Sequence, residues 1–355
     1  MKKLIVVIFM LFTIFVNTVY AKEDYTHIDG EDFFNTTVDG LIDGSKDFSV
    51  GGIINTVSQM LKKELTSIKS LIFCIFIIAF VSGTLNIMKR EHEGVGDAAF
   101  FACFCLMTTA VAKIIGIGVG YATDVIEEMC TFITKLLPVL SVLLVTGGYT
   151  ASATAFYPVF SGAVWLLGVL MDKCIVPLIY VGCVTGIINT MSQKVKLDNF
   201  NKLIKSSSRW ILTAALTLFS GVNAIYGFCT PTLDSVGMKT AKFAIGSIVP
   251  VVGNFLADTM DTVIGGAHLI KNAVGTAGII SLIVTCSVPV IKLSAIMIMI
   301  KFAAALIEPV GDKRFSDMLN EAADAITSGF AAVLIVLLLF VVSLAIVIAS
   351  TNITV

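Results

Sequence analysis

Long apolar runs without charge are the feature that most constrains how this chain can fold. Leu71–Met88 and Phe330–Ile348 are the clearest, and each is close to the roughly 20 apolar residues that a helix needs to cross the hydrocarbon core of a bilayer. The sequence is 57% hydrophobic and 14% charged, whereas soluble domains are roughly 45–50% apolar. We therefore predict an all-α, polytopic integral membrane protein with roughly 8, and up to 10, membrane segments, some of them broken helices.

Charge and cysteine usage exclude other classes of protein. The formal net charge is -1, so the chain offers no basic surface of the kind that binds nucleic acid. The eight cysteines lie in apolar stretches and form no CxxC pair, which favours buried thiols over a disulfide framework or a zinc site. The sequence predicts neither a metal nor another cofactor.

The N-terminus predicts export followed by an acidic segment. Lys2 and Lys3, the apolar run Leu4–Val16 and the small-residue site ending at Ala21 match a signal peptide at 1–21. An uncleaved first span is the alternative, although the run is short for a bilayer crossing. In the segment 22–66, nine acidic residues oppose four lysines, which fits an extracytoplasmic position.

Residues 67–130 predict a pair of helices. Leu71–Met88 precedes Lys89 and Arg90, which the positive-inside tendency places in the cytoplasm. Ala98–Tyr121 then returns to an outside loop that the acidic residues Asp124, Glu127 and Glu128 mark. The glycines of the second helix, Gly116, Gly118 and Gly120, predict close helix packing, because no Lys-Ser or Lys-Thr follows them as in a phosphate loop.

Proline, glycine and charged residues interrupt the next apolar region, at 131–190. We predict three short or broken segments there, at 131–147, 156–171 and 174–190, interrupted by Pro138, Gly147–Gly148, Pro158, Asp172–Lys173 and Pro177. The loop that follows is rich in lysine and is predicted to be cytoplasmic. Apolar residues at helical spacing from Phe200 to Ile211 predict a helix along the membrane surface before a span at 210–229.

An internal repeat relates the two halves of the membrane region. Pro138-Val139 recurs as Pro250-Val251, and the run ending at Pro177 recurs as the run ending at Pro289, both at an offset of 112 residues. A second surface helix at 315–326 leads into the last apolar span in the same way. We predict repeat units at 131–229 and 230–355 with the same orientation, which is a parallel repeat.

Charged residues interrupt the apolar stretch at 248–292, where lipid makes them costly. One helical stripe would hold most of a polar set, which is Asp258, Asp261, His268, Lys271 and Asn272. Two interpretations stay open: a stripe that lines a conduit or an assembly face, and an amphipathic helix on the outer surface. No HExxH, Walker or Ser-His-Asp pattern accompanies these residues, so we predict no catalytic, cofactor-binding or metal-binding residue and no enzyme.

The stretch Lys239–Ile279, with the SVPVIKLSAI and KFAAALIEPVG runs that follow it, resembles the stage III sporulation protein AE family of endospore-forming bacteria. The resemblance is specific through residues 222–315. It implies a structural, non-enzymatic component of the secretion-like channel complex that joins mother cell and forespore during engulfment, located in the mother-cell membrane around the forespore. The implied partners are the other stage III A operon membrane proteins and the forespore protein stage II Q. The family has no catalytic residues to carry over.

Two other functions compete with a channel component. Broken helices and a parallel repeat also suit a secondary transporter of a small solute, and an intramembrane enzyme is a weaker option. A gene neighbourhood of small membrane proteins and a secretion-type ATPase would favour the channel component, and ion-coupled solute uptake in proteoliposomes would favour the transporter.

Overall fold

The computed structural model describes residues 93–191, 197–248, 252–309 and 312–350, together with the helical residues Phe73 and Ile77. The predicted signal peptide at 1–21, the acidic segment 22–66 and nearly all of the predicted span Leu71–Met88 lie outside the described residues. Within the described ranges the regular structure is entirely helical, which confirms the all-α prediction.

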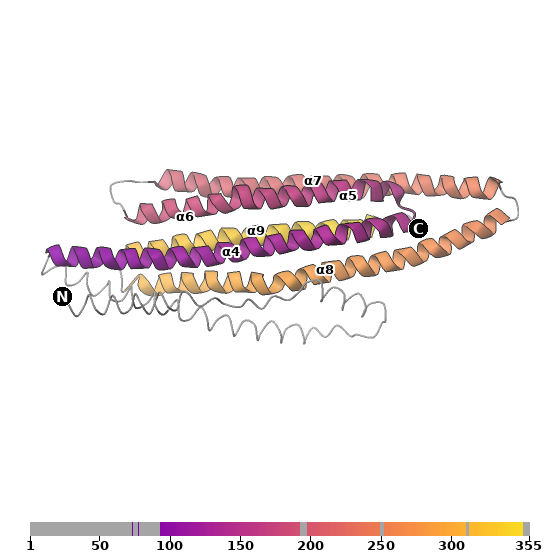
Figure 1. The fold of residues 1–355 in the computed structure, drawn as a ribbon. Coiled ribbons are helices and arrows are strands. Elements are labelled where there is room, and N and C mark those ends of the chain that lie inside the picture. The colour runs from indigo at the N-terminus through magenta and orange to yellow at the C-terminus, as the bar shows by residue number, and fades with distance from the viewer. Residues whose placement is uncertain are drawn as a thin grey trace.

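The described chain forms long helices that lie side by side (Figure 1). In chain order they are α4 (Glu93–Thr146), α5 (Thr150–Leu170), a π-helical turn η1 (Met171–Ile175), α6 (Val176–Met191), α7 (Asp198–Ile248), α8 (Val252–Ile307) and α9 (Lys313–Ser350). The backbone N–H of Val176 bonds to the carbonyl of Met171, so α5, η1 and α6 form one continuous rod. Among the described residues, five rods are long and apolar enough to cross a membrane.

These rods are longer than a bilayer is thick. With 56 residues, α8 measures about 80 Å at the usual helical rise, whereas the hydrocarbon core is about 30 Å across. The helices α7 and α8 reach furthest, and Figure 1 shows their joined ends extending beyond the ends of α4, α5 and α9. A rod that crosses the bilayer steeply therefore continues well outside the hydrocarbon.

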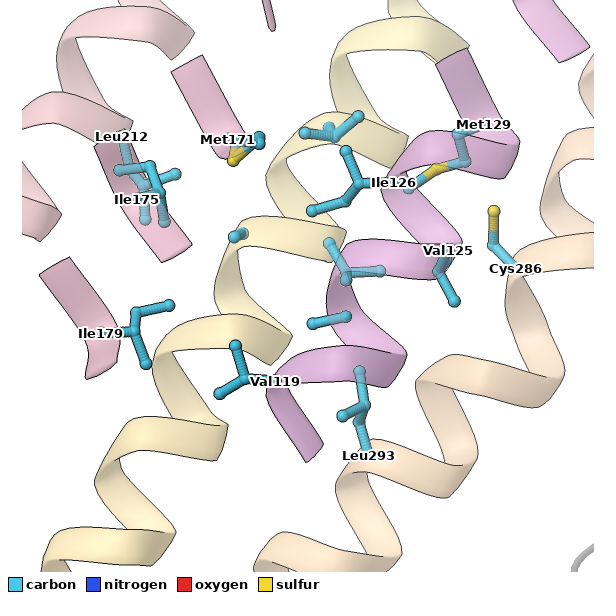
Figure 2. Packing of buried hydrophobic residues seen from close by; sticks show 14 of the residues in the cluster. Val119, Val125, Ile126, Met129, Met171, Ile175, Ile179, Leu212, Cys286 and Leu293 are labelled. Atoms are coloured by element: carbon cyan, nitrogen blue, oxygen red, sulfur yellow. The ribbon is translucent and has the colours of Figure 1, made fainter. Parts of the chain in front are cut away.

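The central rod is α9, which packs against α4, α6, α7 and α8. Buried residues lie on several sides of α9. Those of its first turns are Phe315, Met318, Leu319 and Ala322. Figure 2 shows the core around it, with Val119, Ile126 and Met129 of α4 on one side and Ile175 and Ile179 on the other. Burial from several directions explains why the apolar sequence of α9 is almost continuous.

The acidic loop predicted at Asp124–Glu128 is wrong, because these residues lie inside α4. Asp124 and Glu127 are exposed, whereas Val125, Ile126 and Met129 between and beyond them are buried. The charges therefore form the polar face of a helix whose other face is held in the core. The predicted span Ala98–Tyr121 and the predicted segment 131–147 are consequently one rod.

Most of the predicted helix breaks are also absent. Pro138 and Pro158 lie inside α4 and α5, and the predicted break at Asp172–Lys173 and Pro177 is the π turn η1 followed by α6. Since proline has no N–H to donate to the carbonyl four residues earlier, the wider π turn accommodates Pro177 without ending the rod. The predicted break at Gly147–Gly148 is present, as the turn between α4 and α5.

The two predicted membrane-surface helices are the first turns of longer rods. Residues 200–211 belong to α7 and residues 315–326 to α9, each continuing unbroken into the span that follows. Of the apolar residues at helical spacing in this part of α7, Ile204 packs inside the bundle, whereas Phe200 and Leu203 lie exposed on its surface.

Candidate functional site

The turn between α4 and α5 brings polar side chains into the bundle. Gly148 adopts a φ of 81°, a left-handed conformation that glycine allows at the end of a helix. The amides of Gly147, Gly148 and Tyr149 bond back to carbonyls of the last turns of α4. This reversal directs Tyr149 inward, where it is 1% exposed.

A carboxylate from α7 caps the first turn of α5. The backbone N–H of Ala151 donates to Asp234 Oδ1 at 2.8 Å, and the N–H of Ser152 donates to Asp234 Oδ2 at 3.0 Å. The Ser152 hydroxyl also donates to Asp234. The first amides of a helix have no partner within it and carry its positive dipole end, so Asp234, although 3% exposed, is satisfied.

An aromatic group supports this cap. The hydroxyl of Tyr226 on α7 donates to the Ser152 carbonyl at 3.2 Å. The Tyr226 ring meets the Phe160 ring edge to face, with centroids 5.2 Å apart, a preferred geometry for aromatic pairs. The α5–α7 contact is thus both hydrogen-bonded and packed at its buried end.

On the other side of the turn, α8 contributes His268 and Lys271. The His268 ring lies beside the Tyr149 ring, with the ring centroids 5.1 Å apart. The Lys271 ammonium lies 5.7 Å from the centroid of the Tyr149 ring, within cation–π range. Lys271 is 1% exposed.

Lys271 also contacts the end of α9. Its ammonium donates to the Ile348 carbonyl at 3.4 Å, and Ile348 lies in the last turn of α9, which ends at Ser350. The last carbonyls of a helix have no partner within it and carry its negative dipole end. We call the six residues around this turn the turn cluster: Tyr149, Ser152, Tyr226, Asp234, His268 and Lys271.

The structure brings together part of the predicted polar stripe. His268 and Lys271 both face the α4–α5 turn, and Asn272 is half-buried beside them. Asp258 and Asp261 belong to α8, but their side chains lie outside the described part of the structure. The glycines Gly265 and Gly266, which lie between Asp261 and His268 in the sequence, are inside the helix. The role of the stripe stays a prediction.

Sequence reasoning missed the partners of His268 and Lys271. The sequence alone predicts no role for Tyr149, Asp234, Ser152 or Tyr226. Asp234 is the one charged residue between Arg209 and Lys239. An isolated carboxylate in an apolar helix needs buried hydrogen-bond donors, so this residue was the signal in the sequence that pointed to a buried polar contact. Its donors are 83 residues away at Ala151, which no local pattern indicates.

The turn cluster can stabilise structure more readily than it can make or break bonds. Both of its charged groups are engaged at helix ends, Asp234 with amides and Lys271 with a carbonyl. Among the described residues, no three His, Cys, Asp or Glu side chains gather in a way that suits a metal ion. The arrangement is that of a buried polar network that fixes α5, α8 and α9 around one turn.

Comparison with known proteins identifies the family. The family model described as Stage III sporulation protein AE matches residues 33–351. The Stage III sporulation protein AE of Bacillus subtilis (strain 168) is 28% identical over 316 residues, which is 88% of this chain and 79% of that protein. No solved structure matches the chain. The family model covers nearly the whole sequence, and the chain belongs to the stage III sporulation protein AE family.

Proposed function

We propose that this protein is a structural, non-enzymatic component of the secretion-like channel complex between mother cell and forespore that endospore formation requires. The family match across residues 33–351 carries the link to sporulation. The turn cluster supports a structural role, because its buried charges are engaged at helix ends. Rods of up to 56 residues supply an extended frame that crosses the membrane and continues beyond it.

The proposed location is the mother-cell membrane around the forespore. The basic segments at the start of α7 and of α9 lie at the same end of the bundle, because successive rods run in opposite directions, and the positive-inside tendency assigns that end to the cytoplasm. The joined ends of α7 and α8 would then project toward the space between the two membranes. The proposed partners are the other stage III A operon membrane proteins and, across that space, the forespore protein stage II Q.

The parallel repeat is part of this proposal. The rod α5–α6 with α7, and the rod α8 with α9, are two hairpins that run in the same sense along the chain. Two hairpins of like orientation are the arrangement that a parallel repeat predicts.

Copurification from sporulating cells tests the proposal. A tagged copy that replaces the native gene and supports sporulation should recover stage III A operon proteins after cross-linking at the engulfment stage. An unrelated tagged multispan protein, expressed at the same stage, is the control. Recovery of none of these proteins with a functional tagged copy would refute the channel assignment, and ion-coupled solute uptake by the purified protein would favour the transporter.

A double variant tests the polar stripe. We expect Asp261→Ala with His268→Ala to leave the protein in the membrane and to abolish spore formation, because the stripe is then no longer polar at two of its positions. Membrane fractionation and counts of heat-resistant spores measure the two outcomes. Asp124→Ala, an exposed charge on α4, is the control that should sporulate normally; normal sporulation of the double variant would remove the stripe from the function.

A further inference from the structure

A small polar cavity lies between α6, α7 and α9, far from the turn cluster along each helix. Its lining includes Lys205 and Ser208 of α7, Glu321 and Asp324 of α9, and Gly182 and Cys183 of α6. Its volume is about 20 Å³, which is room for one water-sized occupant. A solute of several heavy atoms does not fit.

The charges around this cavity do not balance. The Lys205 ammonium lies 2.9 Å from Glu321 Oε2 and 3.0 Å from Asp324 Oδ2, so two carboxylates share one cation. The second oxygen of each carboxylate is outside these ion pairs. Glu321 Oε1 has only a 3.4 Å contact with the amide nitrogen of Asn201. Among the described residues that line the cavity, the ionised groups leave a net charge of one negative unit.

Two buried oxygens beside these carboxylates have no hydrogen-bond partner within the described residues. Ser208 is 5% exposed and lines the cavity, and its Oγ bonds to nothing described. Asn201 is 7% exposed; its amide nitrogen donates to Glu321, while its Oδ1 has no partner. Buried polar atoms are nearly always satisfied by protein, water or an ion, so the Ser208 oxygen, which lines the cavity, points to an occupant.

The helix packing makes space for the carboxylate at this position. A Cβ atom at Gly186 of α6 would lie 2.2 Å from Glu321 Oε2, so any other residue there would displace the carboxylate. At Gly182 an added Cβ would lie 3.3 Å from Ile204. Glycines on α6 thus let α9 bring its acidic group against α6 and α7, as small residues do at close helix contacts in membranes.

We propose that this cavity binds one monovalent alkali cation, held by oxygens of Glu321, Asp324 and Ser208. Carboxylate, hydroxyl and amide oxygens are ligands for hard cations. A single negative unit is neutralised by a charge of one, and the cavity has no room for the six or more oxygens that Ca²⁺ takes. The bound cation would fasten the α6–α7 hairpin to the central helix α9.

Sodium binding to the purified full-length protein in detergent tests this site. We expect saturable binding of radioactive Na⁺ at about one ion per chain, and a melting temperature that rises with NaCl but not with choline chloride at equal ionic strength. Ser208→Ala should weaken Na⁺ binding by about tenfold or more, as the loss of a group that supports a metal site does, and Glu321→Gln should abolish it. Asp317→Asn, one turn earlier on α9 and outside the cavity lining, should bind Na⁺ as the wild type does.

The two cavity variants keep the result decisive. If Glu321→Gln does not fold, Ser208→Ala still answers the question, because it leaves both ion pairs of Lys205 in place. Absence of saturable Na⁺ binding by the wild type, or binding unchanged in Ser208→Ala, would mean that the cavity holds water only and would overturn the proposal. Neither result bears on copurification with stage III A proteins, so this site and the channel assignment are tested independently.

Discussion

At the residue scale, Asp234 accepts three hydrogen bonds from the first turn of α5, two from backbone amides and one from the Ser152 hydroxyl. We expect Asp234→Ala to lower the free energy of unfolding by about 2 kcal/mol or more, because it removes a helix cap and leaves buried donors unpaired. Thermal unfolding of the detergent-solubilised protein measures the change. Asp124→Ala, which removes an exposed carboxylate, should change stability by less than about 0.5 kcal/mol. Equal effects of the two substitutions would contradict the capping role.

Lys271 shows how a buried charge in an apolar rod is accommodated. Its ammonium contacts the Tyr149 ring and the Ile348 carbonyl at the end of α9. The sequence alone marks Lys271 as a charged residue that lipid would disfavour. The sequence did not indicate that the end of another helix, 77 residues further along the chain, would supply its acceptor.

At the element scale, one glycine of α4 determines how closely α9 approaches. A Cβ at Gly118 would lie 2.8 Å from Ile326 Cγ1, whereas nothing lies within 4 Å of a Cβ at Gly120. We expect Gly118→Val to destabilise the bundle by about 1–3 kcal/mol through overpacking and Gly120→Val to stay within about 0.5 kcal/mol of the wild type. Comparison of their melting temperatures checks this, and a larger loss in Gly120→Val would show that α4 faces α9 differently.

The three glycines also show the limit of pattern reasoning for an element. Their spacing predicted close helix packing, and the structure places one of them at such a contact, while Gly116 and Gly120 have open space around them. Rotation of α4 about its axis decides which glycine faces a neighbour. That rotation is fixed by the buried face from Phe104 to Leu144 and not by the glycines.

At the scale of the whole molecule, rods longer than the bilayer raise the question of which part lies in lipid. The two tryptophans, Trp165 and Trp210, are both strongly exposed. Trp165 lies in α5, which contains no charged residue, whereas Trp210 directly follows Arg209 in the basic first turns of α7. Charged residues belong near the interface and uncharged rods in the hydrocarbon.

Depth-dependent quenching with brominated lipids measures these positions in proteoliposomes. Trp210→Phe leaves Trp165 as the reporter, and we expect lipids brominated near the middle of the acyl chains to quench it most strongly. Trp165→Phe leaves Trp210, which lipids brominated near the headgroup should quench more strongly, as expected of an interfacial aromatic residue. The reverse order would shift the bilayer toward the basic end of the bundle.

The sequence by itself determined that this protein is helical, resides in a membrane and resembles the stage III sporulation protein AE family, because apolar composition, run length and motif identity are local properties of the chain. Only the structure decided that the acidic residues Asp124 and Glu127 lie on one unbroken helix. It also decided that Asp234 and Lys271 bond to the ends of other helices, and that Lys205, Glu321 and Asp324 surround one cavity. The contacts of Asp234, Lys271 and Lys205 join residues from 77 to 119 positions apart. They depend on how each helix is rotated and shifted against its neighbours. Apolar periodicity shows which face of a helix is buried, but it does not show which helix packs against that face.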